Sequence, residues 1–236
     1  MRIPTLYFPS GLSVRRAKRM AKQLAQTEFI PLSKALDVIA HQEVRLPWHK
    51  AQSLLVDQSP SKKWMSRSDI KAILNAFPHL NYWGPDKKWH EFRSGQITRD
   101  EMEQDFHENR ARLLQATDEC NRACLYLEFM HSRKTINWTR SSYSLKHSVE
   151  NVIRYVDSSI NPYVANGCFI CAAIFKGFEV EQHATEELKA FLNFSSRSPI
   201  IQLDRSFTIR PKSIKEREQV EAISKQVQSV FEQMVS

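Results

Sequence analysis

The longest helical pattern in the chain is TRDEMEQDFHENRARLLQATDECNRACLYLEFMH, which covers residues 98–131. Thr98 can cap the N-terminus of this helix, because a threonine side chain accepts a hydrogen bond from a backbone amide of the first turn. The acidic residues that follow suit the positive end of the helix dipole. Apolar residues recur along one stripe of the pattern: Met102, Phe106, Leu113, Leu114, Cys120, Cys124 and Leu127. We therefore predict one long helix that forms the spine of a larger domain.

Downstream of this spine, helical patterns cover residues 143–156, 162–176 and 186–194. Gly177 can end the second of these helices, because glycine adopts the left-handed conformation at little cost. Apolar and polar residues alternate imperfectly over residues 199–210, which predicts a strand or the arm of a hairpin. The sequence therefore predicts a mainly α fold with at most a minor β element.

A last helix is predicted over residues 213–235, and its apolar residues are spaced alternately by three and four. These residues are Val220, Ile223, Val227, Val230 and Met234. Such a stripe must be covered, either by its own domain or by a second copy of the chain. A homodimer through this amphipathic helix is thus one of two open interpretations.

The N-terminal part of the chain carries three short helical patterns, over residues 13–27, 32–42 and 48–56. Pro31 and Pro47 lie at the starts of the second and third, where proline is well tolerated. One face of the first pattern is basic, and no acidic residue occurs before Glu28. Its basic residues are Arg15, Arg16, Lys18, Arg19 and Lys22.

These patterns divide the chain into three parts. Residues 1–58 form a basic three-helix module, and residues 98–236 form a helical domain that ends in the amphipathic helix. Prolines and tryptophans punctuate residues 59–97, which contain one credible helical pattern at residues 68–76. We predict that residues 59–97 are a connector and packing segment.

The charge balance indicates an acidic partner. Lys and Arg total 34 against 26 Asp and Glu, which gives a formal net charge of +8 and a pI near 9.4. Nucleic acid is a natural partner for such a chain, although a merely basic surface has the same composition. With 236 residues, of which 42% are hydrophobic, the chain can also bury a substantial core.

Glycine and apolar content exclude two classes of protein. The chain has only five glycines, and neither a dinucleotide-binding fingerprint nor a phosphate-binding P-loop can be written with them. The longest apolar run, Cys168 to Phe175, has eight residues. A membrane-spanning helix needs about 20 residues. We therefore expect no nucleotide cofactor and no membrane partner.

The cysteines occur as two close pairs, Cys120 with Cys124 and Cys168 with Cys171. Paired cysteines can bind zinc, but both pairs fall within apolar helical patterns, where free cysteine acts as a small core residue. We therefore expect no metal site. With no secretory leader and no pattern typical of secreted disulfide proteins, we expect the protein in the reducing cytoplasm.

Two segments of the C-terminal domain share a resemblance to known proteins. They are SSYSLKHSVE at residues 141–150 and YVANGCFICAAI at residues 163–174, the latter followed by Gly177 and Phe178. Together they resemble a group of uncharacterised proteins carried by proteobacterial plasmids and integrated mobile elements. PLSKALDVIA at residues 31–40 resembles the small helical module that often accompanies them. The resemblance implies a mobile-element context and no particular activity.

Polar residues of the first segment recur at helical spacing. Tyr143, Lys146, His147 and Glu150 lie three or four residues apart, so they share one face of a helix. Such a face could position a phosphate or perform acid–base chemistry, but ordinary hydrogen bonding on a helix surface is the simpler interpretation. Asn166 and Gly167 are predicted to form a cap and tight turn, whose exposed backbone amides could hold an anion.

We therefore predict a non-enzymatic accessory protein of a mobile genetic element that binds DNA or RNA through basic helical faces. Its predicted nucleic-acid contacts are Arg15, Arg16, Lys18, Arg19, Lys22, Lys50, Arg140 and Lys146. The alternative is a protein-interaction factor, an inhibitor or adaptor that acts on a nucleic-acid enzyme or complex. An enzyme that uses the Tyr143–Glu150 face ranks third.

Overall fold

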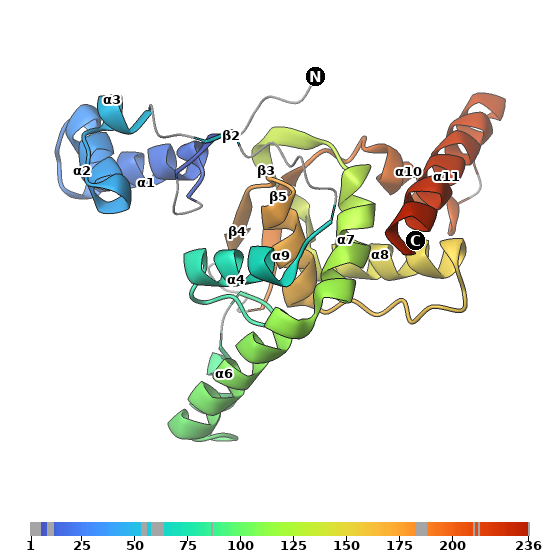
Figure 1. Cartoon of the computed structure of the whole chain (residues 1–236), viewed down its shortest axis with the longest axis horizontal. Coiled ribbons are helices and arrows are strands. Elements are labelled where there is room, and N and C mark those ends of the chain that lie inside the picture. The colour runs from blue at the N-terminus through green and yellow to red at the C-terminus, as the bar shows by residue number, and fades with distance from the viewer. Residues whose placement is uncertain are drawn as a thin grey trace. The chain divides into compact units, whose positions relative to one another are not determined.

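The structure is a computed structural model that describes residues 6–8, 12–52, 56–57, 64–85, 87–182, 188–209, 211 and 213–235. Most of these residues are helical, and a three-stranded antiparallel sheet is a minor element (Figure 1). The chain divides into two compact units, Met1–Ser61 and Lys62–Ser236. The predicted fold class, a small N-terminal helical module and a larger helical domain with a minor β element, is confirmed.

The first unit is built around two helices that pack through small side chains. Ser13 caps the first helix by accepting a hydrogen bond from the backbone amide of Arg16 at 3.1 Å. Ala17 and Ala21 of this helix are buried in one cluster with residues of the second, since small side chains let helix backbones approach closely. The described elements are α1 (Val14–Thr27), α2 (Leu32–Val44), α3 (Trp48–Ala51) and the antiparallel strands β1 (Leu6–Tyr7) and β2 (Val56–Asp57).

The third helix of this unit is shorter than the sequence predicts. The helical pattern extends over residues 48–56, but α3 ends at Ala51, and Val56 pairs with Tyr7 in a strand. Residues 53–55 of that prediction lie outside the described part of the chain.

In the second unit, the predicted spine over residues 98–131 is two helices rather than one. Ala116 leaves the helical conformation, with φ −87° and ψ 43°. The helix before it is largely exposed, whereas the helix after it buries nearly every residue from Cys120 to Leu127. The break thus lets the second helix enter the core. The helices of this half are α4 (Arg67–Ala76), α5 (Trp89–Arg93), α6 (Arg99–Gln115) and α7 (Thr117–Glu128).

Part of the predicted connector belongs to this core. Ser66 caps α4 through a capping box with Asp69, and the helix buries Ile70 and Leu74. Leu80 and Tyr82 follow it into the same apolar cluster. Residues 64–85 are therefore an integral part of the second unit.

A mostly apolar helix, α9 (Asn166–Phe175), lies at the centre of the second unit. Every residue from Asn166 to Ala173 is buried. The helices α4, α7 and α8 (Ser142–Val156) pack against it (Figure 1). The sequence predicts α8 closely, but it starts α9 too early, because residues 162–165 are not helical. Gly177 follows the end of α9 with a positive φ of 78°, as the helix-end pattern predicts.

The sheet corrects two sequence predictions. It contains β3 (Ser132–Ser141), β5 (Ala190–Phe194) and β4 (Val180–Gln182), in that order. The sequence predicts a helix over residues 190–194, but they form the central strand and are buried throughout, so no alternation marks them. It predicts β structure over residues 199–210, but α10 (Pro199–Ser206) begins there, with proline in its first turn.

The last helix, α11 (Ile214–Val235), packs on its own unit. Ile223, Val227 and Phe231 are buried in the main apolar cluster, and Val220, Val230 and Met234 pack against its edge. Its neighbours are α7, α8 and α10. Of the two interpretations of the stripe, the structure shows intramolecular burial, and a homodimer through this helix is not supported.

Replacing Ile223 and Val227 together with lysine is expected to lower the melting temperature by about 10 °C or more, because two charges would be buried without partners. The mass measured by light scattering should not change, since these residues are buried within their own unit. Lysines at the exposed neighbours Gln226 and Gln228 are the matched control and should leave both quantities unchanged. A folded variant with half the wild-type mass would contradict this packing.

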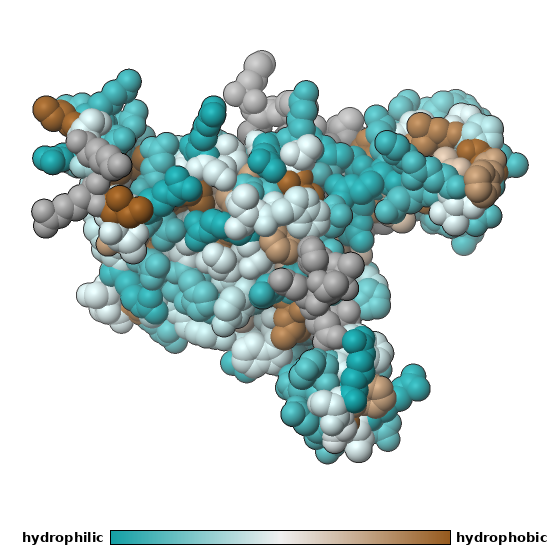
Figure 2. Space-filling model, turned by 180° about the vertical axis from the view of Figure 1, so that it is seen from behind, coloured by the Kyte–Doolittle hydropathy of each residue, from teal (hydrophilic) through white to brown (hydrophobic). Residues whose placement is uncertain are grey.

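The surface is mostly polar on the face that Figure 2 presents. Hydrophilic side chains cover most of it, with small and separate hydrophobic spots (Figure 2). Among the described residues, no helix is both long enough and apolar enough to cross a membrane.

Candidate functional site

The polar face predicted on α8 exists, and a fifth residue completes it. Ser141 caps α8 by accepting a hydrogen bond from the Ser144 backbone amide, so the helix begins just before Tyr143. Tyr143, Lys146, His147 and Glu150 then lie together, and Tyr163 reaches them from the segment that precedes α9. We call these five residues the Lys146 cluster.

Lys146 is a buried ammonium at the centre of the cluster. Its Nζ lies 2.9 Å from Glu150 Oε1, and both side chains are only 7% exposed. The same atom lies 5.3 Å from the centre of the Tyr143 ring and 5.2 Å from that of Tyr163. One carboxylate and two aromatic faces thus compensate a charge that would otherwise be very costly to bury.

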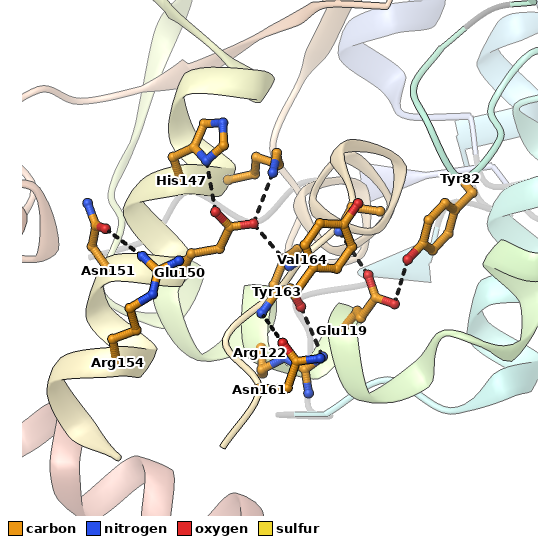
Figure 3. Close-up of polar contacts among 12 residues, drawn as sticks. Tyr82, Glu119, Arg122, His147, Glu150, Asn151, Arg154, Asn161, Tyr163 and Val164 are labelled. Atoms are coloured by element: carbon orange, nitrogen blue, oxygen red, sulfur yellow. Dashed lines mark hydrogen bonds and ion pairs between the residues drawn. The ribbon is translucent and has the colours of Figure 1, made fainter. Parts of the chain in front are cut away.

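Glu150 connects this lysine to the rest of the site (Figure 3). Its Oε2 lies 2.8 Å from His147 Nδ1, and its Oε1 accepts a hydrogen bond from the Val164 backbone amide at 3.3 Å. Burial raises the pKa of Glu150, but the hydrogen bonds from Lys146, His147 and Val164 outweigh it and leave the pKa below its ordinary value. An ionised Glu150 makes Nδ1 the protonated nitrogen of His147. The His147 side chain is half exposed.

A second carboxylate, Glu119 of α7, holds the other side of the segment at residues 161–165 (Figure 3). It accepts hydrogen bonds from the Tyr82 hydroxyl and the Ala165 backbone amide, both at 2.8 Å. Arg122 donates to the carbonyl oxygen of Tyr163 at 3.0 Å. Burial raises the pKa of Tyr163, and the charge of Glu119 raises it further, whereas Arg112 lowers it. Tyr163 therefore lies in a fixed position between two carboxylates.

Asn166 and Gly167 have a different role from the one predicted. They lie inside the first turn of α9 instead of forming a cap and turn before it. The Gly167 amide donates to Tyr82 O at 2.9 Å, and the Asn166 side chain donates to the carbonyl oxygens of Trp83 and Leu188. The amides of residues 164 and 165 likewise donate hydrogen bonds, to Glu150 and Glu119 respectively. These contacts occupy the Gly167 amide, and the two residues join α9 to neighbouring loops.

The sequence missed three residues of this site: Tyr82, Glu119 and Arg122. They come from a loop and from α7, far from residues 141–167 in the chain, and no spacing in the sequence connects them. The structure brings residues 141–150 and 163–174 together through the hydrogen bond from the Val164 amide to Glu150 and the contact of Lys146 with the Tyr163 ring.

Four of the five basic residues of α1 lie on one face of the helix. Arg15, Lys18, Arg19 and Lys22 are spaced i, i+3, i+4 and i+7, so they form one stripe along the helix, which contains no acidic residue. Lys18 and Lys22 are exposed, and Arg15 and Arg19 are partly exposed. We call these four residues the α1 stripe. Arg16 lies further around the helix. Desolvation and the charge of Arg19 lower its pKa, and the charge of Glu43 on α2 opposes them with a smaller effect.

The remaining predicted nucleic-acid contacts separate into two groups. Lys50 is exposed on α3. Arg140 instead donates to Ser148 Oγ at 2.5 Å and pairs with Asp204, and Lys146 is buried with Glu150. Both cations have partners within the second unit, and Lys146 is buried.

The link between α2 and α3 does not form a groove-reading motif in the described residues. Arg45 adopts a left-handed conformation with φ 56°, and Asp37 accepts a hydrogen bond from the Trp48 amide at 2.7 Å. These contacts fix a sharp turn, but α3 has only four residues. It is too short to lie along a major groove as a recognition helix does.

The cysteines lie in the packing between α7 and α9. Cys120, Cys124, Cys168 and Cys171 are all buried and free. Burial raises the pKa of Cys124, as expected for a thiol among apolar side chains. Within the described ranges, no group of three or more His, Cys, Asp or Glu residues is placed to hold a metal ion.

No family model, curated protein or solved structure matches this chain. Its function must therefore be inferred from its own residues.

Proposed function

We propose that the chain binds nucleic acid through the α1 stripe, as an accessory protein of a mobile genetic element. The observation that carries this proposal is a helix with four cations on one face and no acidic residue. The mobile-element context is proposed from the sequence patterns of residues 141–150 and 163–174 alone.

The first unit has an excess of positive charge around this helix. Between residues 12 and 52, three acidic residues, Glu28, Asp37 and Glu43, stand against a larger basic set. That set is Arg15, Arg16, Lys18, Arg19, Lys22, Lys34, Arg45 and Lys50. Asp37 accepts a backbone hydrogen bond, and Glu43 lies near Arg16, so part of the acidic charge is used within the unit.

The α1 stripe fits a phosphate backbone better than it fits base edges. Lys22 lies seven positions after Arg15, a rise of about 10 Å along the helix axis, which spans several phosphates of a duplex. Lysine and arginine contacts to phosphates supply affinity without sequence information. Binding should therefore tolerate many sequences and weaken as salt increases.

Replacing Arg15, Lys18, Arg19 and Lys22 with glutamine tests this proposal. We expect affinity for a short DNA duplex to fall steeply, and the slope of log affinity against log salt to fall by about 0.9 for each phosphate that the variant no longer neutralises. Glutamine is a good helix former, so the helical content should remain. Fluorescence anisotropy over a salt series measures both quantities.

A matched control removes four exposed cations from the second unit, at Lys71, Lys215, Arg217 and Lys225, and so has the same net charge. It should bind almost as the wild type does. Equal losses in both variants would show that net charge alone governs binding, and an unchanged affinity in the α1 variant would refute the proposal.

A further inference from the structure

Two tyrosine rings of the Lys146 cluster are open to solvent. Tyr143 is 49% exposed and Tyr163 is 36% exposed. The ammonium of Lys146 lies at nearly equal distances from both ring centres, 5.3 Å and 5.2 Å. The two rings, which we call the tyrosine pair, therefore share one buried cation while they remain partly accessible.

Both rings are held in place by the surrounding structure. Tyr143 makes an edge-to-face contact with His147, with ring centres 4.9 Å apart. The backbone of Tyr163 is bonded on both sides, by Asn161 Oδ1 at its amide and by Arg122 at its carbonyl. Aromatic surfaces that are already ordered lose little conformational entropy when a ligand stacks on them.

The charges around the tyrosine pair suit a flat, uncharged group. Glu150 pairs with Lys146 at 2.9 Å, so a carboxylate compensates the ammonium that contacts both rings. Arg112 supplies a cation beside the tyrosine pair. Its charge lowers the pKa of Tyr163, and its guanidinium carbon lies 3.9 Å from the centre of the Tyr82 ring. Ordered aromatic rings beside an arginine are how proteins bind single-stranded nucleic acid, whose base faces are open. In a duplex those faces are covered by neighbouring base pairs.

We propose that Tyr143 and Tyr163 stack on unpaired bases of single-stranded nucleic acid, and that Lys146 is the residue that positions both rings. This inference rests on the proposed nucleic-acid binding by α1 and adds a preference for single strands. The second unit then contacts bases, whereas the first contacts phosphates.

The test compares a short oligothymidylate with a duplex of the same length by anisotropy. Replacing both tyrosines with alanine should lower affinity for the single strand by about tenfold or more, given the usual contribution of base stacking, and leave duplex affinity unchanged. Replacing both with phenylalanine should retain binding, because the ring remains. Tyr155→Ala is the matched control, since Tyr155 is 54% exposed on the same helix but packs on Phe207, outside the cluster.

Lys146→Met tests the positioning role separately. Methionine is of similar length but removes the cation between the rings, and Glu150→Gln is made with it so that no carboxylate is buried without a partner. Single-strand affinity should fall in this double variant, while duplex affinity and far-ultraviolet circular dichroism remain unchanged. A loss of affinity for both ligands would indicate general unfolding and contradict a specific role for Lys146.

The outcomes for the two sites can be told apart. If the tyrosine variants bind the single strand as the wild type does, stacking is refuted while binding through the α1 stripe stands. If they lose the single strand while the α1 variant binds both ligands normally, stacking stands and the α1 proposal falls. A wild-type chain that binds neither ligand refutes both.

Discussion

Gly167→Ala is expected to destabilise the second unit by more than about 3 kcal/mol, enough to leave much of the protein unfolded. A Cβ at this position would lie well inside contact distance of Asn81 O and 2.7 Å from Tyr82 O. Both are backbone oxygens, so neither can move without separating the loop from α9. Since alanine is otherwise the better helix former, by about 1 kcal/mol, a loss of stability can only come from this close approach. Urea denaturation at neutral pH measures it.

Gly95→Ala is the matched control for this effect. Gly95 has a positive φ of 73°, but a Cβ there would meet no atom within 4 Å. The substitution should cost only the backbone strain of a left-handed alanine, about 1 kcal/mol. Wild-type stability in Gly167→Ala would show that the loop and α9 are not in contact as described.

Glu150→Ala is expected to cost about 3–5 kcal/mol, because it leaves the Lys146 ammonium buried without its carboxylate. The amide of Val164 and Nδ1 of His147 lose their acceptor in the same step. Chemical denaturation at neutral pH measures the loss. The double variant Lys146→Met with Glu150→Ala should recover part of it, since no charge is then buried alone.

The Glu221–Lys225 pair of α11 provides the control. It has the same i, i+4 spacing and a similar separation, 2.8 Å, but both side chains are exposed. Glu221→Ala should leave stability almost unchanged, because solvent screens an exposed pair. A similar small effect of Glu150→Ala would mean that Lys146 finds another partner or is solvated.

The pH dependence of stability provides a second test of the role of the Glu150 carboxylate. The folded pKa of Glu150 lies below its ordinary value of 4.5, so its contribution to stability is present above that value. It is lost as the pH falls from there through the folded pKa. The wild type should therefore lose more stability over this range than Glu150→Gln, which has no proton to take up at that position.

The sequence predicts where helices begin and which residues share a helix face, because both depend on residues that are close together in the chain. Thr98 caps α6 through its own first turn, as the sequence predicts, and Ser13 caps α1 in the same way. The cations of α1 and the polar face of α8 follow from spacings of three and four residues within one helix. The basic character of α1 is likewise a property of its own residues and needs no distant neighbour.

Elements whose conformation depends on distant neighbours cannot be assigned in this way. Residues 190–194 are apolar at nearly every position, and such a run fits a buried helix as well as a buried strand. Pairing with β3 and β4 makes them a strand. The break at Ala116 has the same kind of cause, since it allows α7 to pack on α9 instead of continuing α6.

The same distinction between local and long-range contacts applies to the candidate site. The sequence alone determined that Tyr143, Lys146, His147 and Glu150 share a face, because the helical repeat places them there. Only the tertiary structure decided that Lys146 is buried, that Tyr163 faces it, and that Glu119 and Tyr82 hold the opposite side of the segment. Those contacts join side chains far apart in the chain. They arise from the packing of α7, α8 and α9, which no local periodicity encodes.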